Sequence, residues 1–110
     1  MSDCIFCKMI SGEIKVNPVK ETESIIVIKD ISPKAPIHYL IIPKKHVCDV
    51  RSLSEEDKEL AGEILLMAGD LSKDLSDCDF RLIANSGKSV GQSVFHAHFH
   101  FIAGKKMDDF

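Results

Sequence analysis

The sequence predicts an α+β fold whose sheet is largely antiparallel. Three observations lead to this prediction. Short apolar and β-branched runs lie both before and after one long amphipathic segment, residues 54–75. The connections between these runs are short and contain proline, glycine and polar residues. The chain has 110 residues, a length that predicts one domain covering residues 1–110.

The first half of the chain is predicted to hold a short helix and the first strands. Residues 4–11 (CIFCKMIS) form the short helix, which Gly12 ends. The mixed segment 13–21 contains Pro18, so any strand there is short or lies at a sheet edge. Two strands follow on either side of a proline-rich loop: residues 25–29 (IIVIK) and residues 38–42 (HYLII).

The second half of the chain begins with the predicted long helix, residues 54–75. Ser54 is placed to cap its first turn, and the acidic residues at 55, 56 and 57 suit the positive end of the helix dipole. Apolar residues recur at helical spacing at Leu60, Ile64, Ala68, Leu71 and Leu75. Leu65, Leu66 and Met67 widen this stripe beyond what one packing surface needs. Strands are predicted at residues 80–84 (FRLIA) and 95–102 (FHAHFHFI), with a polar loop at residues 85–93 between them.

Composition limits the classes of function. The chain carries 14 Lys+Arg and 17 Asp+Glu, a net charge of −3, and 45% of its residues are hydrophobic. This balance excludes a mainly disordered chain and disfavours a nucleic-acid-binding protein. No apolar run approaches the roughly 18 residues of a membrane helix, and the first residues lack the pattern of a secretory signal. We therefore expect a cytoplasmic protein whose four cysteines are not paired in disulfides.

The strongest indication of function is the segment HAHFHF, residues 96–101. On a strand, alternate side chains share a face, so His96, His98 and His100 point one way, about 6.6 Å apart, and the apolar residues between them point the other way. Imidazoles change charge near neutral pH and serve as nucleophiles, acids or bases. Two alternatives remain: packing histidines, or a catalytic metal centre completed by His38, His46 or an acidic residue.

The loop before these histidines offers hydrogen-bond donors and flexible backbone. It contains Asn85, Gly87, Gly91, Gln92 and Ser93. Such a loop can hold phosphate oxygens with backbone N–H groups. The tripeptide GKS at residues 87–89 is superficially similar to a P-loop, but Leu82 stands where the earlier glycine belongs, and a strand follows instead of a helix.

Cys4 and Cys7 form a C-x-x-C pair near the start of the chain. In a reducing compartment this spacing indicates a metal site or a redox pair. A redox pair is expected beside a βαβ pattern, and no predicted strand precedes these cysteines. A metal site would need two further ligands from elsewhere in the chain.

The segment HAHFHFI matches the H-φ-H-φ-H-φ-φ motif of the histidine triad (HIT) family, in which φ is an apolar residue. The resemblance extends over nearly the whole chain, through IFCKMISGEI, KDISPKAPIHYLIIPKKH and NSGKSVGQSVFHAHFHFIAG. Within this family the chain is similar to the Hint branch, whose members resemble nucleoside phosphoramidases. The resemblance implies a five-stranded antiparallel sheet with one long and one short helix. It also implies a homodimer in which the long helix and an edge strand join two subunits into a ten-stranded sheet.

The activity implied by the resemblance is hydrolysis of purine nucleoside 5′-phosphoramidates or related nucleotide conjugates. His98 corresponds to the nucleophile that forms a nucleotidyl-histidine intermediate, which water then hydrolyses. The backbone carbonyl of His96 would hold the other ring nitrogen of His98. His100 and His38 match positions that contact the phosphate or its bridging atom, and Ser93 matches the group that helps to protonate the leaving amine.

The resemblance also implies a nucleotide-binding set. Its nucleoside side comprises Phe6, Ile28, Asp30 and Ile31, and its phosphate side Asn85, Gly91, Gln92, Ser93, His98 and His100. A carboxylate such as that of Asp30 can accept hydrogen bonds from both ribose hydroxyls. Three alternative functions stay open: a dinucleoside polyphosphate hydrolase, a nucleotide-binding regulatory protein with little turnover, and a metal hydrolase that uses the histidines as ligands.

Relatives with the same cysteine pair imply a structural zinc site. The matching ligands in this sequence are Cys4, Cys7, His46 and His96. A closed Cys₂His₂ set leaves no open position for water, so its zinc would be structural. No catalytic metal is expected.

Overall fold

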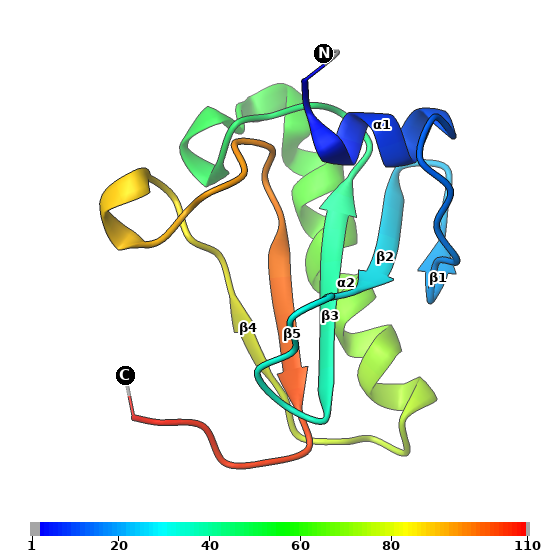
Figure 1. Ribbon diagram of the computed structural model, residues 1–110, viewed down its shortest axis with the longest axis vertical. Coiled ribbons are helices and arrows are strands. Elements are labelled where there is room, and N and C mark those ends of the chain that lie inside the picture. Colours follow the sequence, from blue (N-terminus) through cyan, green and yellow to red (C-terminus); the bar gives the residue numbers. More distant parts are fainter. Residues whose placement is uncertain (1–2, 110) are drawn as a thin grey trace.

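The computed structural model describes residues 3–109, which form a five-stranded antiparallel sheet and two α-helices (Figure 1). The helices are α1 (Ile5–Ser11) and α2 (Lys58–Asp74). The strands are β1 (Lys20–Glu21), β2 (Ile25–Lys29), β3 (Ile37–Pro43), β4 (Arg81–Ile83) and β5 (Phe99–Ala103). They lie in the order β1-β2-β3-β5-β4, and every neighbouring pair is antiparallel. The predicted α+β class is confirmed.

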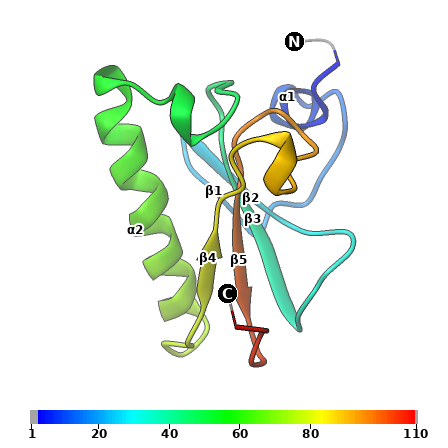
Figure 2. The same ribbon diagram turned by 90° about the vertical axis from the view of Figure 1, so that its left-hand side faces the viewer.

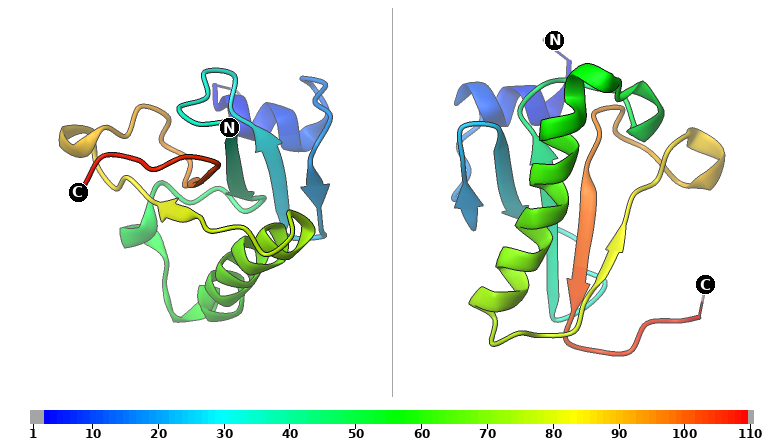
Figure 3. Two further views of the ribbon diagram at one scale, coloured as in Figure 1. Left: turned by 90° about the horizontal axis from the view of Figure 1, so that it is seen from below. Right: turned by 180° about the vertical axis from the view of Figure 1, so that it is seen from behind.

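The two helices lie on opposite faces of the sheet. The long helix α2 covers one face, and α1 lies against one end of the other face (Figures 2 and 3). Two apolar clusters follow from this arrangement. One joins α2 to Val27, Ile41, Phe99 and Phe101, and the other joins Phe6 of α1 to alternate residues of β2 and β3. Ile26, Ile28, Leu40 and Ile42 therefore point away from α2, and they pack with Phe6 at the end of the sheet that α1 covers.

Helix α1 begins and ends as the sequence predicts, within one residue. Cys4 caps its first turn, with its Sγ accepting a hydrogen bond from the backbone N–H of Cys7 at 3.4 Å. Gly12 ends the helix with φ +87°, a backbone conformation that side-chain-bearing residues rarely adopt. Phe6 is buried and fixes the helix to the sheet.

The predicted helix 54–75 divides into a 3₁₀ turn, Glu55–Asp57, and the α-helix α2. The carboxylate of Asp57 accepts the backbone N–H of Ser54 at 3.0 Å, so it closes the turn before the α-helix starts. Met67 is buried in the core, while Leu65 and Leu66 stay 64% and 70% exposed. The apolar surplus expected on this helix is therefore confined to those two leucines. Neither α-helix described by the structure is long and apolar enough to cross a membrane.

The last strand begins four residues later than predicted, at Phe99 instead of residue 95. In the β3–β5 register Phe99 lies opposite Ile41, and β3 ends at Pro43, which has no N–H to donate to a further ladder bond. The backbone N–H of Ala97 instead donates to Val47 O at 2.7 Å. His96 and His98 consequently lie just before the strand, and only His100 lies within it.

Candidate active site and metal-binding cluster

A cavity of about 340 Å³ lies between α1, the end of β2 and the histidine segment. It brings together seven residues of the predicted site: Phe6, Ile28, Asp30, Ile31, Ser93, His98 and His100. Asn85 lies in an adjoining cavity of about 400 Å³, which shares Asp30 and His100 with the first. The predicted residues of the nucleoside side thus meet His98 and His100 around one space. His96, Gly91 and Gln92 do not line this cavity.

Sequence reasoning missed four further apolar residues that line the same cavity: Ile5, Met9, Leu40 and Val94. Ile5 and Met9 are four positions apart on α1, a spacing that places them on one side of a helix. Leu40 lies opposite both Ile28 and His100 in the strand registers. Helical spacing around Phe6 was the available signal for Ile5 and Met9, but Leu40 required knowledge of strand pairing.

His98 is held by the backbone just before it. Its Nδ1 lies 2.8 Å from the carbonyl oxygen of His96, and because a carbonyl only accepts, Nδ1 carries the proton. The Phe6 ring and the imidazole pack in a T-shaped arrangement, with ring centroids 5.1 Å apart. In the neutral ring, Nε2 therefore bears a lone pair, as a nucleophile requires.

His100 lies in a second hydrogen-bonded group with His38 and Asp30. His38 is buried, and its Nε2 lies 2.9 Å from His100 Nδ1 and 3.4 Å from Asp30 Oδ2. Burial, with smaller effects from His98 and His38, lowers the pKa of His100 to about 4. His100 is therefore uncharged at neutral pH.

The Asp30–His38–His100 group has atoms close enough to hold a cation, all within 4.8 Å of one another. The backbone N–H of Lys34 donates to His38 Nδ1 at 3.0 Å, so that nitrogen carries a lone pair and the ring proton sits on Nε2. A protonated Nε2 has no lone pair for a metal ion. This tautomer disfavours the alternative of a catalytic metal at this group.

Gln92 is buried, and its side-chain amide is bonded to backbone on both sides of the loop. Oε1 accepts the N–H of Gly87 at 2.8 Å, and Nε2 donates to the carbonyl oxygens of Cys48 at 2.7 Å and Val94 at 3.1 Å. Ser93, the next residue, is exposed and lines the histidine cavity. Gln92 thus shapes the loop that presents Ser93.

The four residues of the predicted zinc site meet in one cluster, here called the Cys₂His₂ cluster. Its ligand atoms all lie within 4.8 Å of one another. The Sγ–Nδ1 distances are 3.3 Å for Cys4–His96, 3.2 Å for Cys7–His46 and 3.6 Å for Cys7–His96, and the two Nδ1 atoms are 3.0 Å apart. Zinc with its usual bond lengths of 2.0–2.3 Å would separate tetrahedral ligands by roughly 3.3–3.8 Å. The cluster is close to that size.

The tautomer of His96 also suits a metal ligand. This fully buried ring donates from Nε2 to the carbonyl oxygen of Pro43 at 2.8 Å, which leaves the lone pair on Nδ1, among the thiols. Burial lowers the pKa of His96, and burial followed by the hydrogen bond with Cys4 raises the pKa of the Cys7 thiol. A bound cation would therefore meet a neutral imidazole and would displace the thiol protons.

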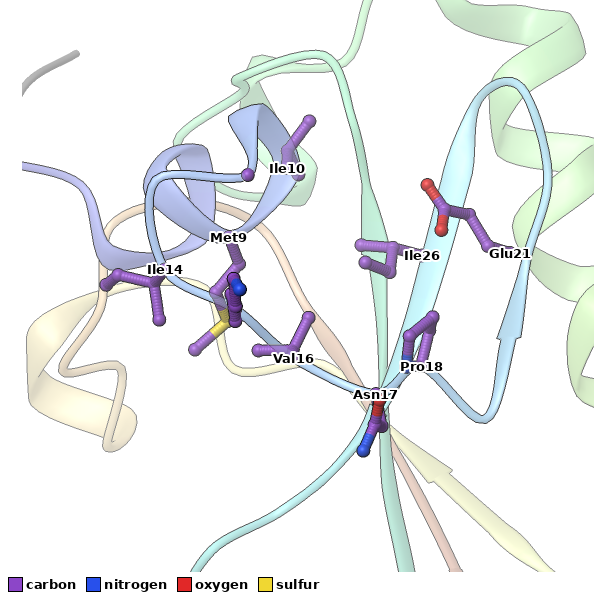
Figure 4. A pocket seen from close by; sticks show the side chains of 10 residues that line it. Met9, Ile10, Ile14, Val16, Asn17, Pro18, Glu21 and Ile26 are labelled. Atoms are coloured by element: carbon purple, nitrogen blue, oxygen red, sulfur yellow. The ribbon is translucent and has the colours of Figure 1, made fainter.

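Another cavity, of about 550 Å³, lies between α1, the segment that follows it and the edge of the sheet (Figure 4). Its lining residues are Met9, Ile10, Gly12, Ile14, Lys15, Val16, Asn17, Pro18, Glu21 and Ile26. No histidine or cysteine is among them, and the carboxylate of Glu21 already pairs with Lys44 at 2.7 Å. The candidate active site is therefore the histidine-lined cavity, although it has the smaller volume.

Comparisons with known proteins show the family to which the chain belongs. The family model described as "Scavenger mRNA decapping enzyme C-term binding" matches residues 3–110. A HIT-like protein of Synechocystis sp. is 42% identical over 104 residues, which cover 94% of this chain and 91% of that protein. Crystallographic and other solved structures include a HIT family hydrolase from Legionella pneumophila, with a TM-score of 0.91 and 38% identity over 96% of both chains.

A second solved HIT family hydrolase, from Clostridium thermocellum, superposes with a TM-score of 0.93 and 38% identity, and the match covers 100% of this chain and 97% of that one. Both hydrolases share the five-stranded antiparallel sheet and two helices described above. Members of this family bind nucleotide substrates. From the motif, the fold and these matches, we conclude that the chain belongs to the histidine triad (HIT) family.

Proposed function

We propose that this protein hydrolyses purine nucleoside 5′-phosphoramidates and related nucleotide conjugates through a nucleotidyl intermediate on His98. One observation supports this most strongly: the His96 carbonyl accepts a hydrogen bond from the Nδ1–H of His98, which leaves Nε2 with a lone pair beside the cavity. A neutral imidazole held in this tautomer is ready for nucleophilic attack without prior loss of a proton.

The proposed reaction has two displacements at phosphorus. In the first, a bond forms from His98 Nε2 to the α-phosphorus while the P–N bond to the leaving amine breaks. The amine leaves with a proton that Ser93 relays from water, because Ser93 lies exposed at the cavity. In the second, water attacks phosphorus, the P–Nε2 bond breaks and the nucleoside monophosphate is released. The water proton passes to solvent, and the imidazole is regenerated.

The nucleoside is proposed to lie between α1 and the end of β2. Apolar side chains of Phe6, Ile28 and Ile31 suit a purine ring, and Ile31 is 98% exposed, so a ligand has apolar surface to cover. Asp30 uses Oδ1 to accept the backbone N–H of Ser32 at 2.7 Å, and its remaining acceptor sites suit the ribose hydroxyls.

The phosphate is proposed to lie on the side of Asn85, Gly91, Gln92 and Ser93, next to His98 and His100. Gly91 has φ +109°, a conformation that favours glycine, and it ends the 3₁₀ turn Lys88–Val90 just before Gln92 and Ser93. Gln92 would contribute through its backbone and through the loop shape, because its amide is engaged by Gly87, Cys48 and Val94.

We further propose that the Cys₂His₂ cluster holds one structural zinc ion. Cys4 and Cys7 come from the start of α1, His46 from the segment after β3, and His96 from the segment before β5. A metal held by all four residues would link these three parts of the chain. Its ligand set is closed, so it would take no part in the displacements.

We also propose a cytoplasmic homodimer of one-domain subunits. The exposed Leu65 and Leu66 on α2, together with the position of β4 at one end of the described strand order, suit a two-fold contact that continues the sheet. Light scattering at micromolar concentration is expected to give twice the subunit mass. The double change Leu65→Lys and Leu66→Lys is expected to yield monomers, and a monomeric wild type would contradict the dimer.

The test of the proposed function is a side-by-side assay of wild type with adenosine phosphoramidate, diadenosine polyphosphates and nucleoside monophosphate esters. Preference for the phosphoramidate supports the proposal, and preference for the polyphosphates supports the other hydrolase. Tight binding without turnover would identify a regulatory nucleotide-binding protein. Immediate loss of activity on addition of a chelator would favour a metal hydrolase and contradict covalent catalysis by His98.

A further inference from the structure

His38 has no ring nitrogen left for a substrate. It lies on β3 with 5% of its surface exposed, and its Nδ1 accepts the backbone N–H of Lys34 at 3.0 Å. A backbone amide keeps its proton, so Nδ1 must offer the lone pair of the ring. The ring proton is consequently on Nε2, which makes this atom a donor.

The Nε2–H of His38 has two acceptors within reach. His100 Nδ1 is nearer, at 2.9 Å, and Asp30 Oδ2 lies at 3.4 Å. When His100 Nδ1 accepts this hydrogen bond, the single proton of the neutral His100 ring must sit on Nε2. The Lys34 amide thus determines the tautomer of His38, and His38 in turn determines the tautomer of His100.

His98 and His100 therefore carry their protons on opposite ring nitrogens. His98 has its proton on Nδ1, toward the His96 carbonyl, and a lone pair on Nε2. His100 has a lone pair on Nδ1 and its proton on Nε2. The two rings are neighbours, with centroids 5.2 Å apart, and both line the same cavity. One ring can attack phosphorus while the other donates a hydrogen bond to a phosphoryl oxygen.

We propose that His38 is a positioning residue that keeps the proton of His100 on Nε2, where it stabilises the negative charge that grows on the phosphoryl oxygen. This inference rests on the proposed function, because it assigns His38 and His100 their parts in that reaction. It differs from the expectation that His38 itself contacts the phosphate.

The alternative tautomer shows why the fold would need His38. Without the Nε2–H of His38, His100 could carry its proton on Nδ1 and donate it to the carboxylate of Asp30, which belongs to the same group. His100 Nε2 would then present a lone pair to an anionic phosphate. Losing one donor to a developing oxyanion typically costs about 10²–10³-fold in kcat.

The direct test is the ¹⁵N NMR spectrum of wild-type protein at neutral pH with His100 assigned. The inference predicts a pyridine-like, unprotonated Nδ1 and a pyrrole-like, protonated Nε2 for His100, and the reverse pattern for His98. A protonated Nδ1 on His100 would overturn it. This measurement uses the wild-type protein alone, without a substrate and without any substitution.

Two substitutions separate positioning from packing. His38→Gln keeps an N–H donor near the place of Nε2, while His38→Met has similar bulk and no donor. We expect kcat to fall about 10²-fold in H38M and to recover to within about tenfold of wild type in H38Q. KM should stay within about threefold in both. The His100 Nδ1 signal should shift toward the protonated form in H38M only.

The outcomes distinguish this inference from the proposed function. Wild type that turns over none of the nucleotide conjugates would contradict the proposed function, whatever the ¹⁵N spectrum shows. Active wild type with the reversed His100 tautomer would overturn only the inference. Equal kcat in H38M and wild type would also overturn it, and equal losses in H38M and H38Q would show a packing role instead.

Discussion

Two clusters of titratable side chains contain the histidines two positions before and two positions after His98, and they differ in the backbone group that meets a histidine ring. The Cys₂His₂ cluster and the Asp30–His38–His100 group each bring their ligand atoms within 4.8 Å. In the first, the Pro43 carbonyl accepts a hydrogen bond from the Nε2–H of His96, which leaves the lone pair of that ring on Nδ1, among the ligand atoms. In the second, the backbone N–H of Lys34 donates to Nδ1 of His38, so the proton of that ring is on Nε2, among the ligand atoms.

This difference shows that side-chain proximity alone does not separate a metal site from a hydrogen-bonded relay. When a backbone carbonyl accepts a hydrogen bond from one imidazole nitrogen, the other nitrogen has a lone pair that can bind a metal. When a backbone amide donates to one imidazole nitrogen, the other nitrogen carries the proton and acts as a donor. His96 connects the Cys₂His₂ cluster to His98, since its side chain belongs to the cluster and its carbonyl orients the His98 ring.

The largest expected effect is at the residue between the two clusters. His98→Ala should lower kcat by at least about 10⁴-fold, because it removes the atom that bonds to phosphorus. Affinity for a nucleoside monophosphate should stay within several-fold, because the cavity keeps its apolar walls. Single-turnover kinetics and calorimetric titration measure the two quantities. Turnover above about 1% of wild type would contradict a covalent role.

The metal content tests the contrast between the clusters. Protein purified without chelators should hold about one zinc per subunit, and Cys7→Ala should hold almost none, because a structural site binds tightly through its full set of ligands. The same substitution should lower the melting temperature more than it lowers kcat.

Cys48→Ala provides the matched control, because Cys48 is exposed and lies outside the cluster. It should change neither metal content nor melting temperature. Two zinc ions per wild-type subunit, with the second lost in Asp30→Asn, would show that the other group also binds metal. That result would contradict the tautomer argument.

Gln92 is a third residue whose side-chain orientation is determined by backbone partners. Its Nε2 faces two carbonyl oxygens, so Gln92→Glu would place a carboxylate oxygen where a donor is required. We expect a loss of about 2–3 kcal/mol in the free energy of unfolding and a fall in kcat of about tenfold. Gln92→Ala should cost less than Gln92→Glu in stability, as measured by urea unfolding. The reverse order would show that the amide contacts matter little.

A smaller effect is expected in the pH dependence of stability. The pKa of His100 in the folded chain is about 4, below its ordinary value of 6.5, mainly because of burial. As the pH falls below 6.5, the unfolded chain takes up the proton first, so the free energy of unfolding decreases until about pH 4. The expected decrease from His100 is about 1–2 kcal/mol after screening by solvent.

Burial lowers the pKa of His96 as well, so this histidine acts in the same direction. His100→Phe should make the stability profile flatter between pH 6.5 and pH 4 than in wild type. Urea unfolding at a series of pH values compares the two proteins. An unchanged slope in His100→Phe would mean that His100 is not the buried neutral group described above.

The sequence predicts some elements closely because their determinants are local. The strand Ile25–Lys29 was predicted to the residue, since its β-branched run is bounded by polar residues. Cys4 and Gly12 mark the two ends of α1 by their own cap chemistry. The start of β5 was wrong by four residues, because it depends on where Pro43 ends the partner strand.

The candidate site was predictable in its residue types but not in its hydrogen bonds. Alternation along residues 96–101 indicated that the three histidines share a side, and His98 and His100 do line one cavity. The ring of His96 lies in the Cys₂His₂ cluster instead. The amide of Gln92 meets Cys48, which is 44 positions away, and no sequence pattern predicts that contact. Nor could spacing show whether Lys34 or Pro43 faces an imidazole, although these contacts separate the two clusters.

The central claim is that His98 Nε2 attacks phosphorus, and rapid-quench mass spectrometry tests it most directly. Wild type mixed with excess adenosine phosphoramidate and quenched in base should carry a nucleotidyl group on the peptide that contains His98, formed and lost at rates compatible with turnover. A substrate chiral at phosphorus should give product with retained configuration, as two displacements require. Inverted product without any adduct on His98 would show direct attack by water and would contradict the account.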